Sequence, residues 1–552
     1  MNANAAIDFT AEAFALHAQS PMGRQAAGEG FLNGFIRHSG VSRFVGHAEA
    51  EAESTVFIDR IHEVDPAAEA ICGSPRRLEA VEAEGLLFCY HPILAEHAWR
   101  RRARGAARYS LCGLTHTMSS HRVITAATDL LTAPIHPWDA LICPSRAVRG
   151  VVEALLERQR DYLKERFGPI AVEAPQLPVI PLGVDGAAFE AAPGFREAAR
   201  ARFQAGPEDV VVLYVGRLSA HAKANPLPMF MALERAAKAS GKRVHLLLVG
   251  WFAAAPQAQI YQQGAARLAP SITTRIVDGR LAEGRANAWA AADIFLQLAD
   301  SVQESFGLAP VEAMAAGLPL VVSDWDGFRD TVEDGVQGFR VPTLQPRAGE
   351  GGDLALNYDL GLYDYDQFLA AASMFTAVDV AAAADALARL IDDPGLRRRM
   401  GEAGRARVRQ LYDWRVVIKA YQALWEELAD RRAAATAELH RPHPAWRPDR
   451  PDPFDVFAGF PTRALAGTDL VRPARLSDLA ERRAIPGAAM MGSLLPINAE
   501  IEPLLARLAQ GPATVAELVG LLPEPHRASG GRVIAWLAKM DFAAVAPEGG
   551  AR

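Results

Sequence analysis

Short apolar runs alternate with amphipathic stretches along most of the chain. Runs such as Leu86–Tyr90, Val212–Val215, Ile294–Leu298 and Leu320–Ser323 have the length and composition of buried strands, and a first strand is expected near Phe14–His17. Strands of this kind separated by helices predict parallel sheets, because helices then cover both faces of the sheet. The alternation occurs twice, to about residue 190 and from about 195 to 400, which predicts two α/β domains.

The segment from Glu304 to Pro319 links two of these predicted strands. Pro310 suits the first turn of a helix, Gly317 suits its C-terminal cap, and Pro319 prevents the helix from continuing. The loop Glu304–Leu308 therefore follows the carboxyl end of a strand. Open α/β sheets bind their ligands at that end.

This loop combines backbone donors with two acidic side chains. The amides of Phe306, Gly307 and Leu308 would be unpaired at the helix start, and Gly307 lets a ligand approach the backbone closely. Such a site favours anionic ligands, which makes two carboxylates there unexpected. Glu304 and Glu312 fit the site if they accept hydrogen bonds from sugar hydroxyls. We interpret Glu304 as a contact of a transferred sugar and Glu312 as a contact of a nucleotide ribose. The alternative is that both acids only complement the helix dipole.

The segment resembles the Glu-x7-Glu signature of retaining glycosyltransferases of the family-4 type, the glycosyl transferases group 1. Four further segments match that family in the same order: Asp139–Ser145, Val179–Asp185 with Phe189, Val212–Leu218 with Lys223, and Ser323–Gly327. The resemblance runs from about residue 10 to about residue 430. The ordered set is specific, whereas each piece alone would be weak.

The resemblance implies an α/β fold of the GT-B architecture, in which two Rossmann-like domains face each other. We expect an acceptor domain at 1–192 and a nucleotide-sugar domain at 193–430, which ends in a helix that crosses back to the first domain. A Pro-rich linker or wrapping segment follows at 431–495, and a small winged-helix-like or α/β module at 496–552. An insertion between Leu344 and Thr376 has no assigned role.

Arg217 and Lys223 supply the cations that a nucleotide-sugar needs. A departing diphosphate gains charge in the transition state, so fixed cations stabilise it more than the ground state. Five residues separate this pair, where the family commonly has four, and Ala224 replaces the usual glycine after the lysine. Surface cations on a solvated loop are the alternative. The position directly after a strand that ends in Gly216 favours the diphosphate role.

The first domain offers weaker candidates. His116 ends the apolar run 109–115, and a histidine at such a strand end lies near the transferred sugar in the family; a purely structural histidine is the alternative. His91 is a poorer candidate on the same grounds. Gly23 and Gly28 lie between the expected first strand and a helix, where a glycine loop would approach the donor phosphates. Their spacing is not a nucleotide fingerprint.

The resemblance thus gives a complete set of expected site residues. Catalytic roles fall to His116, Arg217, Lys223 and Glu304. Donor contacts fall to Gly23, Gly28, Gly216, Arg217, Lys223, Glu304, Ser305, Phe306, Gly307, Leu308 and Glu312. We expect neither a metal nor another cofactor, because the two cations can replace a divalent ion.

Composition and charge limit the classes of binding partner that the chain can be expected to have. A net charge of −7 argues against nucleic acid. The arginines at 100–102, 104 and 108 could contact anionic lipid headgroups or a phosphorylated acceptor, although a solvated helix face also explains them. Four cysteines without CxxC spacing, no signal peptide and no apolar span indicate a cytoplasmic protein, with peripheral contact at the inner membrane face as an open alternative.

Three functions remain open at this point. The first is transfer of a hexose from a nucleotide-sugar to a hydroxyl of a glycan, lipid-linked saccharide or protein, with retention implied by the resemblance. The second is another GT-B activity, such as a nucleotide-sugar epimerase or hydrolase. The third is a scaffold without activity that binds a protein partner through the C-terminal module. The donor base, the sugar, the acceptor and the oligomeric state do not follow from the sequence.

Overall fold

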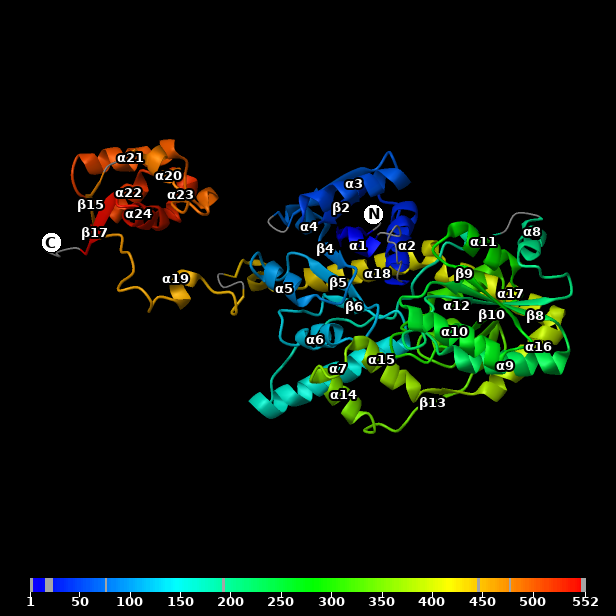
Figure 1. Cartoon of the computed structure of the whole chain (residues 1–552). Coiled ribbons are helices and arrows are strands. Elements are labelled where there is room, and N and C mark those ends of the chain that lie inside the picture. Colours follow the sequence, from blue (N-terminus) through cyan, green and yellow to red (C-terminus); the bar gives the residue numbers. More distant parts are fainter. Residues whose placement is uncertain are drawn as a thin grey trace. The chain divides into compact units, whose positions relative to one another are not determined.

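The computed structural model describes residues 3–14, 23–74, 77–190, 194–443, 447–475 and 478–547. The chain divides into two compact units, Met1–Trp446 and Arg447–Arg552 (Figure 1). The first unit contains two six-stranded sheets and the second a small three-stranded sheet. We describe each unit by itself.

The first sheet is parallel and has the order β3-β2-β1-β4-β5-β6. Its strands are β1 (Ala6–Asp8), β2 (Arg43–His47), β3 (Glu69–Gly73), β4 (Leu86–Cys89), β5 (Ser110–Leu114) and β6 (Ala140–Ile142). Its helices are α1 (Ala11–Phe14), α2 (Gly23–His38), α3 (Glu51–Val64), α4 (Glu79–Glu84), α5 (Ala95–Arg102), α6 (His121–Asp129) and α7 (Arg146–Phe167). The direction of winding reverses between β1 and β4, which are neighbours.

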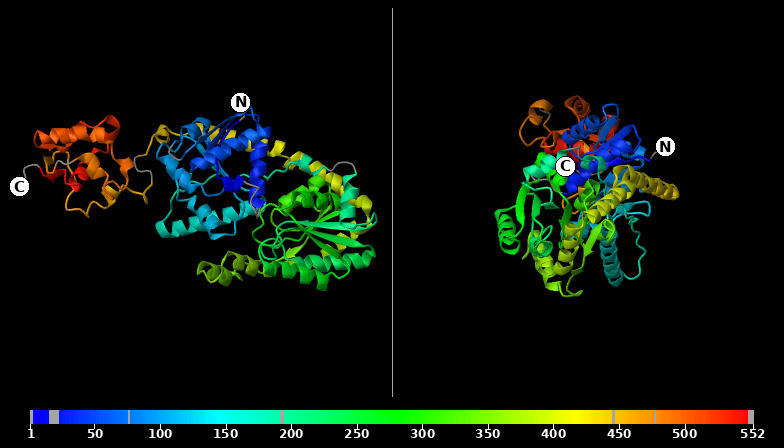
Figure 2. Two further views of the ribbon diagram at one scale, coloured as in Figure 1. Left: turned by 45° about the horizontal axis from the view of Figure 1, so that its top comes forward. Right: turned by 90° about the vertical axis from the view of Figure 1, so that its right-hand side faces the viewer.

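The second sheet repeats this topology with the order β12-β11-β10-β7-β8-β9. Its strands are β7 (Val210–Val215), β8 (Val244–Gly250), β9 (Thr273–Asp278), β10 (Ile294–Gln297), β11 (Leu320–Ser323) and β12 (Gly338–Val341). Its helices are α8 (Phe195–Arg202), α9 (Pro226–Ser240), α10 (Ala255–Leu268), α11 (Ala282–Ala291), α12 (Leu308–Ala316), α13 (Phe328–Thr331), α16 (Val380–Asp392) and α17 (Pro394–Arg407). Helices cover both faces of this sheet (Figure 2). The predicted pair of Rossmann-like domains is therefore confirmed.

The first strand differs from the prediction. β1 is Ala6–Asp8, and Phe14 belongs to α1, whereas residues 15–17 lie outside the described residues. β1 is only three residues long and contains Ala6, so it carries little β signal. Its burial comes from the pairing with β2 and β4 on either side.

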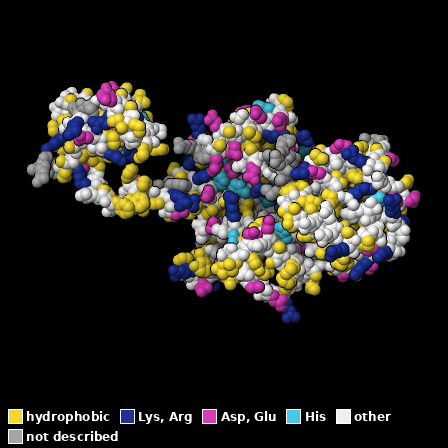
Figure 3. All heavy atoms as spheres, viewed as in Figure 1, with side chains coloured by type: hydrophobic (Ala, Val, Ile, Leu, Met, Phe, Trp, Pro, Cys, Tyr) yellow, Lys and Arg dark blue, Asp and Glu magenta, His cyan; other side chains and the backbone are white. Residues whose placement is uncertain are grey.

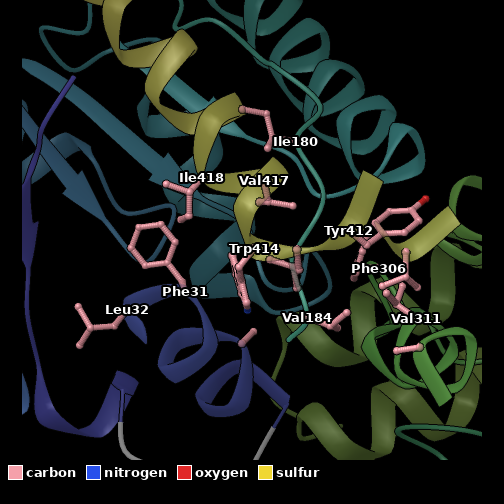
Figure 4. Packing of buried hydrophobic residues seen from close by; sticks show 14 of the residues in the cluster. Phe31, Leu32, Ile180, Val184, Phe306, Val311, Tyr412, Trp414, Val417 and Ile418 are labelled. Atoms are coloured by element: carbon pink, nitrogen blue, oxygen red, sulfur yellow. The ribbon is translucent and has the colours of Figure 1, made fainter. Parts of the chain in front are cut away.

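A continuous hydrophobic cluster joins the two domains. Trp414 opens helix α18 (Trp414–Ala433) and lies among Phe31, Val184 and Val417 (Figure 4). A Cβ atom at Gly183 would lie 2.4 Å from the Trp414 ring, so this glycine makes room for the indole. Further along α18, the side-chain amide of Gln422 donates to two backbone carbonyls of the first domain, those of Ala3 and Ser39, at 3.0 Å. The last helix of the second domain thus crosses back to the first, as predicted.

An insertion follows β12 and returns to α16. It contains β13 (Thr343–Leu344), α14 (Gly352–Asp359), α15 (Tyr365–Met374) and β14 (Ala377–Val378). β13 and β14 pair antiparallel and close the base of the insertion, and α14 and α15 form a helical hairpin beyond them. Asp364 caps α15 with a complete capping box, so the second helix has a well-defined start.

The C-terminal unit begins at Arg447, before the residue 496 at which sequence reasoning places the module. Its sheet has the order β16-β15-β17 and is antiparallel, and β15 lies in the segment expected to be a linker. Its elements are α19 (Pro453–Val456), β15 (Leu470–Pro473), α20 (Leu479–Arg483), α21 (Asn498–Ala509), β16 (Ala513–Thr514), α22 (Val515–Gly520), α23 (Glu524–Arg527), α24 (Gly530–Lys539) and β17 (Ala543–Ala546). A hydrophobic core of its own supports this unit.

The described helices include none that combines the length and the apolar character needed to cross a bilayer. On the face shown in Figure 3, basic and acidic side chains are intermingled and do not form one basic field. This distribution agrees with the negative net charge of the chain.

Candidate active site

The central strands of the second sheet carry the predicted donor residues. β7 and β10 pair directly, with Val212 opposite Ile294, and the winding of the sheet reverses between them. Gly216 and Arg217 follow β7, and Glu304 lies in the loop after β10. These loops therefore meet at the topological switch point, where open α/β sheets form their ligand crevice.

Lys223 and Glu304 form an ion pair in this crevice. The Nζ atom of Lys223 lies 3.3 Å from the Oε2 atom of Glu304. The Glu304 side chain is 8% exposed and that of Lys223 is 25% exposed, so the pair is accessible from the Lys223 side. The two residues that sequence reasoning assigned to the diphosphate and to the sugar thus lie side by side.

Arg217 is held by a chain of hydrogen bonds that reaches the first domain. Its Nη2 atom donates to Gln303 Oε1 at 2.7 Å, and Gln303 Nε2 donates to the Tyr365 hydroxyl at 3.1 Å. That hydroxyl lies 2.7 Å from Ser119 Oγ. Nearby, the Tyr358 ring of the same insertion stacks on His121 with ring centroids 3.6 Å apart. The insertion without an assigned role therefore bridges the two domains beside Arg217.

We expect Tyr365→Phe to lower kcat about tenfold with little change in Tm. The substitution keeps the ring but removes the hydroxyl shared by Gln303 and Ser119, and two neutral hydrogen bonds contribute about 1–2 kcal/mol together. Arg217 would then lose a fixed orientation. Steady-state kinetics and thermal denaturation measure the two effects, with Tyr363→Phe in the same insertion as the control. Equal kcat values for both variants would contradict the positioning role of Tyr365.

The start of α12 has the geometry of an anion site. Gly307 has φ +89°, and a Cβ atom there would lie 2.3 Å from the Phe328 ring, so the position requires glycine. Among the residues that the structure describes, none accepts a hydrogen bond from the amides of Phe306, Gly307 or Leu308. These donors are available at the positive end of the helix.

Ser305 and Phe306 have structural partners that the sequence did not reveal. Ser305 Oγ donates to the carbonyl of His116 at 2.7 Å, and Ser145 Oγ donates to the carbonyl of Ser305 at 2.7 Å. Both bonds cross from one Rossmann-like domain to the other. Phe306 is 2% exposed and packs near Tyr412, so its side chain is part of the hydrophobic core.

His116 follows β5, as predicted, and lies beside this loop. Its Nε2 atom is 3.0 Å from the Tyr90 carbonyl, which can only accept, so Nε2 carries the proton and Nδ1 keeps a lone pair. Burial lowers the pKa of His116 to about 4, although the bond to Tyr90 opposes this shift. The imidazole is therefore neutral near pH 7 and acts as a hydrogen-bonding group.

Glu312 lies one to two turns inside α12 and is partly buried. Burial raises its pKa to about 7, while the charge of Arg285 acts in the opposite direction. A carboxyl group of this kind is a hydrogen-bond acceptor once it is ionised. Asp300, which sequence reasoning did not select, has the same character: burial raises its pKa to about 7, and it accepts from the Asn225 amide at 3.2 Å.

We expect Glu312→Gln to raise the Tm of the ligand-free protein at pH 8 by about 2–4 °C, and the gain to shrink as the pH is lowered toward 5. The folded pKa of Glu312 lies above its unfolded value, so ionisation of this group destabilises the fold as the pH rises to about 7. Glutamine removes this cost. Thermal denaturation across this pH range measures the effect, and a constant difference in Tm at all pH values would contradict the assignment.

Gly23 and Gly28 do not form a loop. Both lie in α2, and Gly23 is its first residue. A Cβ atom at Gly28 would lie 2.3 Å from the Ala13 carbonyl oxygen, so Gly28 allows α1 and α2 to pack closely. The expectation of a glycine loop was wrong because the first strand ends earlier than predicted, and the segment before Gly23 lies outside the described residues.

A second polar cluster lies at the switch point of the first sheet. Asp8 is the last residue of β1 and accepts from His47 at 3.0 Å and from His91 at 3.1 Å, and His97 Nε2 lies 3.5 Å away. Burial alone would raise the pKa of Asp8, but the histidines hold it well below its ordinary value. Asp8, Cys89, His91 and His97 present ligand atoms within 4.8 Å of one another and could hold a metal ion.

The hydrogen bonds of His91 argue against this residue as a metal ligand. The Ile93 amide donates to His91 Nδ1 at 3.1 Å, which places the imidazole proton on Nε2. That proton points to Asp8, so Nε2 has no lone pair for a metal. His91 therefore serves as a hydrogen-bond donor to Asp8.

The basic cluster of the first domain is not one solvated face. Arg101 is completely buried and binds Asp139 through two contacts of 2.5 and 2.8 Å. Arg104 pairs with Glu79 and Glu82. The solvated helix face favoured from the sequence and the alternative of a lipid- or phosphate-binding face are therefore both wrong for Arg101, because its charge is neutralised inside the domain.

Comparison with known proteins agrees with this geometry. Residues 209–349 match the family model described as glycosyl transferases group 1. The phosphatidyl-myo-inositol mannosyltransferase of Mycobacterium tuberculosis is 31% identical over 279 residues, which cover 50% of this chain and 59% of that protein. The D-inositol 3-phosphate glycosyltransferase of Kribbella flavida is 26% identical over 367 residues, which cover 65% of this chain and 75% of that protein.

A solved structure supports the fold. The glycosyltransferase of Rickettsia africae superposes with a TM-score of 0.50 at 12% identity, covering 77% of this chain and 98% of that one. Two parallel sheets of equivalent order with a crevice at the switch point define a GT-B protein. The chain is similar to the glycosyl transferases group 1 family over residues 209–349. It spans about three fifths of the length of the M. tuberculosis relative that it matches.

Proposed function

We propose that the chain is a retaining glycosyltransferase that moves a hexose from a nucleoside-diphosphate sugar to a hydroxyl group. The observation that carries the proposal is the Lys223–Glu304 pair of 3.3 Å at the switch point of the second sheet. It unites a cation for the diphosphate with an acceptor for sugar hydroxyls. The free amides at the start of α12 add donors for an anionic group.

In this proposal the protein positions the reactants and stabilises charge. The bond between the anomeric carbon and the diphosphate oxygen breaks, and a bond from the acceptor oxygen to the same face of that carbon forms. The acceptor proton moves to the departing diphosphate oxygen. Lys223 and Arg217 stabilise the charge on the diphosphate, Glu304 and neutral His116 orient the sugar, and Glu312 binds the ribose.

The residues of the site supply these interactions without a bound cofactor. Arg217 offers a planar fork and Lys223 a point charge, and both suit phosphate oxygens. Two hydrogen bonds between Ser305 and the first domain, with His116 and Ser145, keep the loop next to that domain, so bulk water has limited access to the reacting carbon.

The alternatives differ in what happens after the donor binds. A hydrolase would pass the sugar to water, an epimerase would change the configuration of the sugar, and a scaffold acting through the C-terminal unit would not turn over. The paired cations and acids favour transfer, because an inactive protein has no need of a buried carboxylate beside a lysine.

A panel of nucleotide-sugars tests the proposal. Thermal shifts are measured with UDP-, GDP-, ADP- and dTDP-sugars, and products formed from the best stabiliser are identified by mass spectrometry. We expect one base to be preferred and a glycosylated product to form when a hydroxyl acceptor is present. Absence of stabilisation by the whole panel would refute the proposal. Release of free sugar as the only product would favour the hydrolase.

A further inference from the structure

A cavity of about 440 Å³ lies between the two Rossmann-like domains beside Glu304. Its first-domain wall is apolar and includes Met118 and Val151. Its second-domain wall is polar and includes Trp325 and Asp326. An apolar wall opposite a polar one suits a ring that has a C–H face and hydroxyl groups at its edge.

Asp326 has an unusual backbone and surroundings. It has φ +41°, in the left-handed region that is uncommon for residues other than glycine and is adopted most often by asparagine and aspartate among them. Its Oδ1 atom lies 3.3 Å from Ser145 Oγ, and burial followed by the charge of Glu304 raises its pKa to about 7. A partly buried carboxyl group with a left-handed backbone that faces a cavity is typical of functional positions.

The carboxyl groups that line the cavity outnumber its cations and disfavour an anionic ligand. Glu304, Asp324 and Asp326 contribute carboxyl groups. Arg329 is the cation of this lining, and its Nε atom lies 3.7 Å from Asp324, which Arg340 also contacts at 3.3 Å. The positive charge is therefore directed to Asp324. A phosphate or carboxylate would meet the acids of the wall, whereas hydroxyl groups would find acceptors.

We infer that this cavity binds the sugar acceptor, that the acceptor is an uncharged ring rich in hydroxyl groups, and that Asp326 binds its attacking hydroxyl. The inference rests on the proposed function and specifies its acceptor. Asp326 and Glu304 face the same cavity, so a hydroxyl bound by Asp326 lies next to the sugar that Glu304 orients. The class includes hexoses and cyclitols, and excludes their phosphate esters.

Two substitutions separate the carboxylate from the backbone strain. Asp326→Asn keeps the shape and tolerates a left-handed conformation, but removes the negative charge. Asp326→Gly removes the side chain and relieves the strain. We expect both to raise the acceptor KM about tenfold to a hundredfold, because a hydrogen bond to a charged group is lost. Asp385→Asn, an exposed site on α16, is the matched control.

The measurements use the full chain and the nucleotide-sugar that stabilises it best. Methyl α-D-mannopyranoside, myo-inositol and myo-inositol 3-phosphate serve as acceptor probes. Hydrolysis of the donor without an acceptor is measured for every variant, together with the donor-induced thermal shift. We expect both of these to stay within about twofold of the wild type, while transfer to the uncharged probes is impaired.

Each other outcome overturns the inference in an identifiable way. Unchanged acceptor KM values in both Asp326 variants would remove Asp326 from the acceptor site. Transfer only to the phosphate ester, or to none of the probes from a donor that binds, would refute the uncharged class. Failure of the wild type to bind any donor would instead refute the proposed function and this inference with it.

Discussion

Replacing Lys223 by alanine will lower kcat about a hundredfold to a thousandfold and leave the fold intact. This is the loss expected when one fixed group that stabilises transition-state charge is removed. The substitution also leaves Glu304 without its cation, so the carboxylate repels the incoming diphosphate. Turnover with the best donor, circular dichroism and Tm measure the change.

The control for this variant is Lys238→Ala. Lys238 is an exposed lysine on α9 that pairs with Glu234 at 2.9 Å, so it tests the loss of a lysine without the loss of a site. We expect its turnover to equal that of the wild type. Turnover at the wild-type level in Lys223→Ala would show that the diphosphate is held elsewhere.

Replacing Arg101 by alanine will destabilise the first domain by about 3–5 kcal/mol. Arg101 and Asp139 are both completely buried, and Asp139 also accepts from the amides of Leu111 and His136. Without the guanidinium, a carboxylate remains in the interior of the domain with no opposing charge. A fall in Tm of roughly 6–20 °C is expected.

Arg100→Ala provides a close comparison on the same helix. Arg100 contacts Glu49 at 3.3 Å, and both side chains are solvent-accessible, so we expect a change within about 0.5 kcal/mol. Denaturant unfolding of both variants measures the difference. Similar stabilities for the two variants would mean that the buried pair contributes no more than a surface contact.

The secondary structure of the second domain agrees closely with the prediction from its sequence. β7, β10 and β11 are apolar runs with strong strand signals, and α12 begins and ends near its proline and glycine. Hydrophobic periodicity and the proline and glycine residues at helix ends are local properties of the sequence, so they can be recognised without knowledge of the fold. The placing of Lys223 and Glu304 in one site was reached only through the resemblance, because 81 positions separate the two residues, and their ion pair was not predicted.

Other parts of the site depend on long-range contacts that have no local signal. Tyr365 acts beside Arg217 only because the insertion folds back over the crevice. The neighbouring residues do not predict the strained, left-handed backbone of Asp326. An aspartate directly before Gly327 does, however, indicate a tight turn. The glycines of α2 look like a ligand loop in sequence, but most of their role is to admit the Trp414 ring and the Ala13 backbone.

The hydrogen bonds of Ser305 have a mechanical consequence. The Ser305 side chain donates to the His116 carbonyl, and the Ser305 carbonyl accepts from Ser145. The peptide before α12 is therefore part of the second domain but is hydrogen-bonded to the first. Any hinge motion that parts the lobes must therefore break these bonds and displace the loop. Product escape and disassembly of the sugar pocket would then be a single event, and a probe placed on either lobe would report the same rate.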